Sequence, residues 1–455
     1  MSSFVCADEI RQAFSDALSR MYKREVPQYG QLLQLVADVN AAVLREMPDL
    51  RSQLAFSHES SRIDAERHGA IRLGTPRELA LVARMFAILG MQPVGYYDLS
   101  SAGVPVHATA FRPVTDESLA FNPFRVFTSL LRLDLIADSA LRAEATNILE
   151  RRQIFSARSV ELLELFEVQQ GLTASQAADF VQALIETFRW HEQAMVDADT
   201  YERLLAAHRL VADVVSFKGP HINHLTPRTL DIEAAQQEMI RRGLGAKALI
   251  EGPPTRRCPI LLRQTSFTAL KEKITFAGIA PYGQAEGAHT ARFGEIEQRG
   301  VALTPAGRDL YDACLSQARG GDTKTPFPTR LMEAFEAFPD DIDALRTQGL
   351  AFFRYAPSSP MPDLGGLNFD LERLVALGIV RAEPVTYEDF LPVSAAGIFQ
   401  SNLGGDANVV FAPSDARAYF EQALGRTVLN EMDLYRDAER TSIERTRKAF
   451  ESVAA

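Results

Sequence analysis

The order of predicted elements in residues 61–112 recurs in residues 213–300, and this repeat limits the folds open to the chain. Each segment begins with an extended stretch that carries a histidine, continues with Thr-Pro-Arg and a helix that ends at glycine, and finishes with strand-like runs. The tripeptides begin at Thr75 and Thr226, and alone they are a weak signal. Because the surrounding elements match in order, we interpret the repeat as a diverged internal duplication. The sequence thus predicts an α+β protein with two related modules.

The opening stretch of the first module carries two candidate site residues, His68 and Arg72. Ala-Ile-Arg-Leu after His68 is typical of a strand, and residues an even number apart on a strand share a face. His68 and Arg72 therefore point the same way. A neutral imidazole is a good ligand for a borderline metal, and a guanidinium can bind a carboxylate held near that metal. After them, Thr75 and Glu78 are predicted to form a capping box.

The composition is that of a soluble globular protein, and it narrows the possible partners. The chain has 455 residues, 46% hydrophobic and 24% charged, which is enough for two or three domains. A net charge of -11 argues against nucleic acid as the main partner, because phosphate neutralisation needs a basic surface. No secretory signal and no run of about 18 apolar residues is found, so we expect a cytoplasmic protein without a membrane partner. Three widely spaced cysteines indicate neither a disulfide framework nor a cysteine zinc site.

The rest of the chain is predicted to be mainly helical. Helical spacing of apolar residues covers most of residues 124–212, including the stretch 124–136, and it resumes after residue 301. We accordingly expect five parts: N-terminal helices (1–60), a first βαβββ-like module (61–112), a helical insertion (113–212), a second βαβββ-like module (213–300), and C-terminal helices with an active-site loop (301–455).

Face-to-face pairing of the modules around a pseudo-twofold axis would bring three candidate metal ligands together. His68 and His224 lie on the first strand of each module, and Glu295 lies on the last strand of the second. Two histidines and one carboxylate with open positions form the facial triad of non-haem iron(II). The duplication therefore predicts a metal site between the modules.

Neighbouring residues leave the ligand set open at this point. His221 and His224 belong to one His-Ile-Asn-His stretch, and Glu295 and Glu297 lie two apart on one strand, so the two glutamates share a face. Of the other histidines, His107 is the one best suited to line a pocket. Imidazole serves equally well as a buried core group and as a ligand, so residue types alone do not decide.

Long motifs of the chain carry a resemblance to a known family. They are ERHGAIRLGT, FKGPHINHLTPRTLDI, HTARFGEIEQRG and YEDFLPVSAAGIFQSNLG. These motifs resemble the 2-oxoadipate dioxygenase/decarboxylase family, also called hydroxyglutarate synthase, which is related to the vicinal oxygen chelate fold. Carried over position by position, the resemblance implies an iron(II) site formed by His68, His224 and Glu295.

The same resemblance implies the substrate contacts and the reaction. Arg72 is implied to be the catalytic residue that binds a substrate carboxylate, with further contacts from His68, His224, Val393 and Ser394. The implied reaction converts 2-oxoadipate and O2 to 2-hydroxyglutarate and CO2 in lysine breakdown, and both oxygen atoms enter the product. Two other hypotheses are a glyoxalase-like isomerase or lyase and a non-enzymatic small-molecule binding protein. Oxygen consumption and metal analysis distinguish the three.

Overall fold

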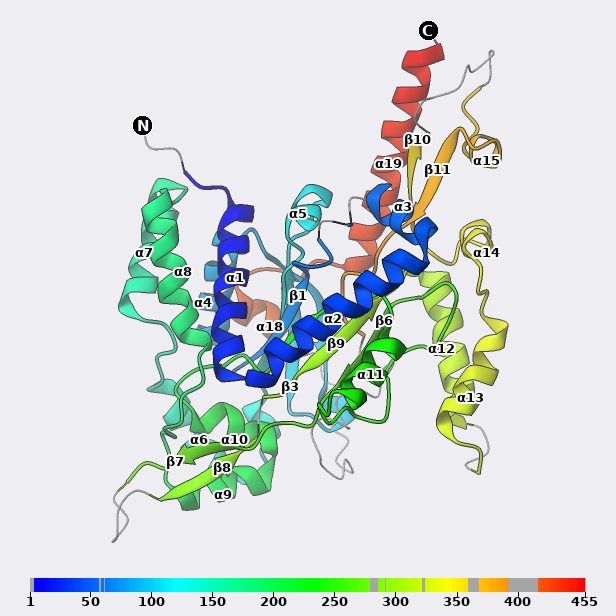
Figure 1. Ribbon diagram of the computed structural model, residues 1–455. Coiled ribbons are helices and arrows are strands. Elements are labelled where there is room, and N and C mark those ends of the chain that lie inside the picture. The colour runs from blue at the N-terminus through cyan, green and yellow to red at the C-terminus, as the bar shows by residue number, and fades with distance from the viewer. Residues whose placement is uncertain are drawn as a thin grey trace.

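Five strands form the central sheet, and helices cover it (Figure 1). The computed structural model describes residues 4–56, 59–60, 62–278, 285–290, 292–320, 324–358, 368–391 and 416–454. The sheet has the order β2-β3-β4-β1-β5. Its strands are β1 (Arg67–Leu73), β2 (Gln92–Asp98), β3 (Val106–Arg112), β4 (Arg125–Leu131) and β5 (Leu225–Pro227).

The first module has the order β1, α4 (Pro76–Ile88), β2, β3 and β4. β4 is parallel to β1, and β3 is antiparallel to both β2 and β4. α4 begins as predicted, because the hydroxyl of Thr75 accepts from the backbone nitrogen of Glu78 while the Glu78 carboxylate accepts from the backbone nitrogen of Thr75. The four strands and one helix form a βαβββ unit.

The second module repeats this arrangement. Antiparallel pairing of β6 with β9, a parallel bridge from Arg228 to Glu297, and an antiparallel bridge from Glu251 to Gln264 match the strand pairs of the first module. β5 pairs antiparallel with β1 and joins the modules. The predicted α+β class with paired βαβββ modules is therefore confirmed. Its elements after β5 are α11 (Ile232–Arg241), β6 (Leu262–Ser266) and β9 (Glu295–Arg299).

The prediction of a helix over residues 124–136 is wrong. This stretch contains β4, which lies between β3 and β1 and completes the first module. Every residue of β4 is buried, so apart from Arg125 the strand carries apolar or small side chains on both faces, and it shows no regular alternation with polar residues. A continuous apolar run of this kind does not distinguish a buried strand from a buried helix.

The prediction that the second Thr-Pro-Arg opens a helix is also wrong. Thr75 is the N-cap of α4, whereas Thr226 and Pro227 lie within β5 and α11 is capped by Asp231, whose side chain accepts from the backbone nitrogen of Ala234. The two tripeptides therefore occupy different structural positions. The duplication is visible in the order and pairing of the elements instead.

The remaining elements are mainly helices, as expected. Two strand pairs, β7 (Glu272–Thr275) with β8 (Glu286–His289) and β10 (Phe353–Pro357) with β11 (Val380–Pro384), were not predicted. The exact domain boundaries remain a prediction. In the described ranges, no helix has both the length and the apolar character needed to cross a bilayer. The helices outside the modules are α1 (Ala7–Glu25), α2 (Pro27–Glu46), α3 (Pro48–Phe56), α5 (Asp116–Phe121), α6 (Ser139–Glu150), α7 (Ala157–Gln169), α8 (Ala174–Ile185), α9 (Ala198–Ala207), α10 (Arg209–Ser216), α12 (Pro305–Gly320), α13 (Phe327–Ala334), α14 (Ile342–Thr347), α15 (Leu371–Ala376), α18 (Ala416–Leu424) and α19 (Glu431–Ala454).

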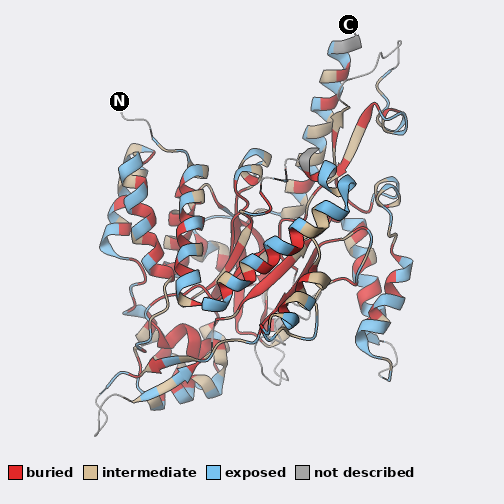
Figure 2. Ribbon diagram, viewed as in Figure 1, coloured by how far each residue is buried: buried red, intermediate tan, exposed pale blue. Residues whose placement is uncertain are grey.

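The central strands separate two apolar cores. Side chains alternate between the two faces of each strand, and this alternation decides on which face the site lies. Ile71 and Leu73 of β1 enter one core together with α1, α2 and α4, while Phe127 of β4 enters the other. Figure 2 shows buried strands at the centre and helices whose outer faces are exposed. His68 and Arg72 lie on the opposite face of β1 from Ile71, as the period of two requires.

The N-terminal helices hold the segments of the second module in place. Figure 1 shows α2 crossing in front of the sheet, and α2 packs against α11. The hydroxyl of Tyr22 in α1 donates to the backbone oxygens of Asn223, at 3.0 Å, and Phe293, at 2.8 Å. The side chain of Asn40 in α2 donates to the Arg228 oxygen at 3.1 Å and accepts from the Leu230 nitrogen at 2.8 Å. These contacts fix the backbone on both sides of β5.

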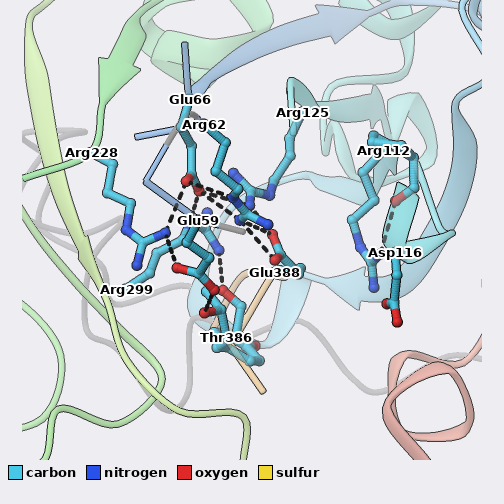
Figure 3. A network of polar contacts seen from close by, with 12 residues as sticks. Glu59, Arg62, Glu66, Arg112, Asp116, Arg125, Arg228, Arg299, Thr386 and Glu388 are labelled. Carbon is cyan, nitrogen blue, oxygen red and sulfur yellow. Dashed lines mark hydrogen bonds and ion pairs between the residues drawn. The ribbon is translucent and has the colours of Figure 1, made fainter. Parts of the chain in front are cut away.

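A buried network of opposite charges lies where the two modules meet the segment that follows β11 (Figure 3). Glu66 is within 3.5 Å of four arginines, and Glu388 contacts Arg62 and Arg125. Burial alone would raise the pKa of Glu66, but Arg62 and Arg228 hold it well below its usual value. The charges therefore balance within the network. Its buried members are Arg62, Arg125, Arg228, Arg299, Glu59, Glu66, Glu297 and Glu388.

Removing one charge from this network should destabilise the fold. Glu388→Gln leaves Arg62 and Arg125 with uncompensated buried charge, so we expect the free energy of unfolding to fall by about 3–5 kcal/mol. Urea denaturation followed by fluorescence of the single tryptophan, Trp190, measures this. As a control, Glu167→Gln removes a carboxylate from an exposed pair with Arg84 and should cost less than about 1 kcal/mol. Equal losses in the two variants would contradict the prediction.

The same carboxylate makes stability depend on pH. Burial would raise the pKa of Glu388, but Arg62 and Arg125 lower it to about 2 in the folded state. Its contribution is therefore fully present above the unfolded-state pKa of about 4.3 and is lost as the pH falls towards 2. Glu388→Gln should flatten the fall in unfolding free energy over this range.

Candidate metal centre

Three side chains from separate segments converge at one point of the sheet. His68 lies on β1, His224 directly precedes β5, and Glu295 is the first residue of β9. Nε2 of His68 is 3.1 Å from Oε1 of Glu295, and Nε2 of His224 is 3.8 Å from the same oxygen. One potential ligand atom from each residue lies within 4.8 Å of the others. Two imidazoles and a carboxylate thus face a common point.

The pairing of β1 with β5 brings the two histidines together. His68 is opposite Thr226, two residues after His224, and the imidazole centroids are 5.3 Å apart. Oε1 of Glu295 accepts hydrogen bonds from Oγ1 of Thr226 at 3.1 Å and from Nε2 of Gln264 at 2.8 Å. These donors fix the carboxylate against both histidines.

Glu297 contacts the other nitrogen of the His68 ring. Its Oε2 is 2.9 Å from Nδ1 of His68, and its two oxygens accept from Nε and Nη2 of Arg299 at 2.9 Å each. Burial favours the neutral acid, but Arg299 and His68 lower the pKa of Glu297 to about 2. An ionised Glu297 keeps a proton on Nδ1 of His68 and leaves Nε2 as the ligand atom.

His224 is held neutral by its surroundings. Burial is the largest effect and lowers the pKa of His224 to about 4, although Glu295 acts in the opposite direction. Its Nδ1 is buried and has no hydrogen-bond partner within the described part of the chain. The ring centroid is 4.8 Å from that of Phe293. A neutral imidazole beside a carboxylate is suited to bind a metal ion.

The alternatives from the sequence lie elsewhere. Nε2 of His221 is 3.2 Å from Asp213 rather than from Glu295. His107 lies on β3, where its Nδ1 is 3.4 Å from the hydroxyl of Tyr96. Neither histidine lines the cavity at the converging side chains. The His-Ile-Asn-His stretch is irregular before β5, so no periodicity could have separated its two histidines.

The cavity opens beside the three converging side chains. Arg72 and His68 share its wall, as their spacing on one strand predicted. The Arg72 side chain is 18% exposed, and its Nη1 is 2.6 Å from Oδ2 of Asp213. The other two predicted substrate contacts, Val393 and Ser394, lie outside the described residues. Further lining residues are Leu99, Val104, Val106, Phe127, Phe293 and Phe390, so most of the wall is apolar.

Five polar lining residues were not identified from the sequence: Ser129, Arg209, Asp213, Gln264 and Thr290. Gln264 lies opposite Glu297 where β6 pairs with β9. The strand-like pattern of residues 259–267 was a signal that could have indicated which face of the strand the Gln264 side chain is on. Arg209 and Asp213 lie on α10. Charged residues are common on helices, and no spacing marked these two.

The donor set fits a divalent first-row transition metal. Imidazole nitrogens suit such ions, and a carboxylate supplies a negative oxygen ligand. Within the described ranges, no other group of three histidine, cysteine, aspartate or glutamate side chains lies close enough to share an ion. Three ligands leave open positions for exogenous molecules on the cavity side.

Comparison with known proteins decides the family. The family model described as 2-oxoadipate dioxygenase/decarboxylase matches residues 14–402. The chain belongs to the 2-oxoadipate dioxygenase/decarboxylase family. The family member of Escherichia coli is 56% identical over 448 residues, covering 98% of this chain and 99% of that protein. The family member of Pseudomonas putida is 54% identical over 459 residues, covering 99% and 98%.

Solved structures of this family share the fold. The crystal structure of hydroxyglutarate synthase from Pseudomonas putida has a TM-score of 0.88 and 49% identity, with 99% of each chain covered. The same enzyme in complex with 2-oxoadipate has a TM-score of 0.90 and 50% identity, again with 99% of each chain covered. These family members match the whole length of the present chain, including the helical additions.

Loss of any converging side chain should abolish metal retention in this 2-oxoadipate dioxygenase/decarboxylase family member. His68→Ala, His224→Ala and Glu295→Ala each leave two protein ligands, too few to hold a divalent metal ion. The metal content of each variant after anaerobic loading and desalting, measured by inductively coupled plasma mass spectrometry, checks this prediction.

Two variants separate ligands from their neighbours. Glu297→Gln should weaken metal binding by about 10- to 100-fold, because the orientation of His68 is lost but the ligand remains. His221→Asn should retain the metal. If Glu297→Gln loses the metal while Glu295→Gln keeps it, the assignment of the carboxylate ligand is wrong.

Proposed function

We propose that this chain is an iron(II)-dependent 2-oxoadipate dioxygenase/decarboxylase. It converts 2-oxoadipate and O2 to 2-hydroxyglutarate and CO2, a reaction in which all atoms of both reactants appear in the products. The observation that carries the proposal is the convergence of His68, His224 and Glu295 on a cavity that also contains Arg72. Family membership and the complex of the Pseudomonas putida enzyme with 2-oxoadipate support it.

The proposed metal site divides the work between the ion and the protein. Iron(II) held by His68, His224 and Glu295 would supply dioxygen activation, which protein side chains do not provide. Neutral His224 and the Glu297-oriented His68 present nitrogen lone pairs to the ion. The carboxylate of Glu295 is fixed by hydrogen bonds and needs little reorganisation to bind.

Arg72 gives the cavity its preference for an anion. A 2-oxo dicarboxylic acid offers one carboxylate beside the keto group and a second at its far end. Arg72 is on the same strand face as His68, four residues away, and its long side chain lies in the cavity wall. A guanidinium in a poorly hydrated site is the natural partner for the distal carboxylate.

The apolar wall excludes water from the reacting groups. The Phe390 ring is 5.0 Å from the His68 ring and 5.2 Å from that of Phe127, so the three rings pack together beside the converging side chains. A dry cavity strengthens the pairing of Arg72 with a carboxylate and limits side reactions of intermediates.

Oxygen-electrode measurements test the proposed reaction. Anaerobically purified protein loaded with iron(II) should consume oxygen with 2-oxoadipate, release one CO2 per O2 and form 2-hydroxyglutarate. Chelation of the iron should stop the reaction. Isomerisation without oxygen uptake would indicate a glyoxalase-like enzyme, and binding without turnover or metal would indicate a binding protein. Either result contradicts the proposal.

Substitution of Arg72 tests the substrate contact. Arg72→Gln removes the positive charge and should lower kcat/KM for 2-oxoadipate by about two to three and a half decades, equivalent to about 3–5 kcal/mol. Arg72→Lys should retain iron and fold but lose most activity on 2-oxoadipate, because an ammonium does not restore the planar fork. The monocarboxylic analogue 2-oxohexanoate should be affected much less if Arg72 binds the distal carboxylate. An equal loss on both substrates would instead assign Arg72 to the carboxylate beside the keto group.

A further inference from the structure

Arg72 is held by a carboxylate from α10, the helix at the boundary between the predicted helical insertion and the second module. Asp213 lies on α10 and is 5% exposed, and its Oδ2 accepts from Nη1 of Arg72 at 2.6 Å. Its other oxygen, Oδ1, is 2.8 Å from Nε2 of His289 and 3.2 Å from Nε2 of His221. Burial would raise the pKa of Asp213, but His221 and Arg72 hold it well below its usual value. One buried carboxylate thus links Arg72 to two histidines.

The two histidines are themselves fixed. The hydroxyl of Tyr201 is 2.8 Å from Nδ1 of His289, and burial raises the pKa of Tyr201 to about 12, so the hydroxyl keeps its proton and donates it to His289. Trp190 stacks on His289, with the rings 7° from parallel, and meets the His221 ring edge-on at 4.8 Å. Asp213 therefore has little freedom to rotate away from Arg72.

The contacts of Arg72 involve one nitrogen of its guanidinium, Nη1. When the Asn223 amide is oriented so that its nitrogen donates to the Ala70 oxygen at 3.2 Å, its oxygen accepts from Nη1 of Arg72 at 2.8 Å. Nη1 also donates to Asp213. Within the described part of the chain, the hydrogen bonds of Arg72 to Asp213 and Asn223 both use Nη1, which leaves Nε and Nη2 for a ligand in the cavity.

Two effects of Asp213 on substrate binding oppose each other. Its negative charge partly neutralises Arg72 and would weaken the attraction for a substrate carboxylate. Its hydrogen bond fixes the planar guanidinium and reduces the conformational entropy lost when a carboxylate binds. Three donors hold Asp213, so it cannot move aside to relieve the charge competition. This rigidity favours orientation as its main effect.

We propose that Asp213 is a positioning residue that orients Arg72 toward the distal carboxylate of a dicarboxylic 2-oxo acid. The selectivity for dicarboxylic over monocarboxylic 2-oxo acids then depends on Asp213 as well as on Arg72. This inference rests on the proposed function, because it assumes that Arg72 binds that carboxylate. It also gives α10 a direct part in substrate choice, since this helix carries Asp213.

Steady-state kinetics of Asp213→Asn on two substrates test the proposal. The variant keeps the shape of the side chain but loses its charge and one acceptor, so KM for 2-oxoadipate should rise by about 10- to 100-fold, the value of a charge-assisted hydrogen bond. Iron content and KM for 2-oxohexanoate should change little. Tyr201→Phe, which removes only the hydroxyl behind His289, should raise KM for 2-oxoadipate in the same direction by a smaller factor. This second variant supports the test if Asp213→Asn folds poorly.

A double-mutant cycle asks whether Asp213 acts through Arg72. In the Arg72→Gln background, Asp213→Asn should produce no further rise in KM, because the side chain that it positions is gone. Glu233→Gln is the matched control: it removes a carboxylate that pairs with Arg263 at 2.6 Å outside the cavity, and both substrates should retain their kinetics.

Five results would overturn the inference. A lower KM for 2-oxoadipate in Asp213→Asn would mean that Asp213 only neutralises Arg72, and an equal rise on both substrates would mean a general structural role. A full effect in the Arg72→Gln background would mean that Asp213 acts independently. Unchanged kinetics in Arg72→Gln alone would overturn the proposed substrate contact and the inference with it. If Arg72→Gln loses activity on 2-oxoadipate while the kinetics of Asp213→Asn are unchanged, only the inference is overturned.

Discussion

The antiparallel pairing of β1 with β5 is the contact on which the site depends. It is short, joining Arg67, His68 and Gly69 to Pro227, Thr226 and Leu225. On one side of this seam β1 is parallel to β4, and on the other β5 meets β9 through a parallel bridge. The seam turns two incomplete sheets into one surface, and the three converging side chains lie on it. A shift of one residue in its register would turn His68 away from Glu295.

The buried charges explain how so short a pairing of β1 with β5 is stabilised. Arginines and glutamates from both modules and from the segment after β11 neutralise one another, and burial makes each ion depend on its partners. Glu297 belongs both to this network and to the site, because Arg299 contacts both oxygens of its carboxylate and His68 contacts one of them. The orientation of a candidate ligand is therefore tied to the packing between modules. The same arrangement makes the network costly to disturb.

The sequence predicts those features that depend on local periodicity. The period of two places His68 and Arg72 on one face, and Thr75 with Glu78 marks the start of α4. It does not reveal β4, because a strand buried on both faces has no polar side to mark its period. It also does not separate Glu295 from Glu297, since both lie on the same face and contact different nitrogens of one ring. Asp213 is recognisable only after the fold has brought α10 to Arg72, which lies 141 positions away in the chain.

The separation of the converging residues along the chain has a consequence for biosynthesis. His68 and Glu295 are 227 positions apart, so they meet only when the second module has been made and has docked on the first. Closing so long a loop is entropically costly and belongs to the late, non-local steps of folding. A nascent chain that ends before β9 lacks the carboxylate altogether. The three converging side chains can therefore share a metal ion only after translation has passed the second module, and a partly made chain offers such an ion histidines without the carboxylate.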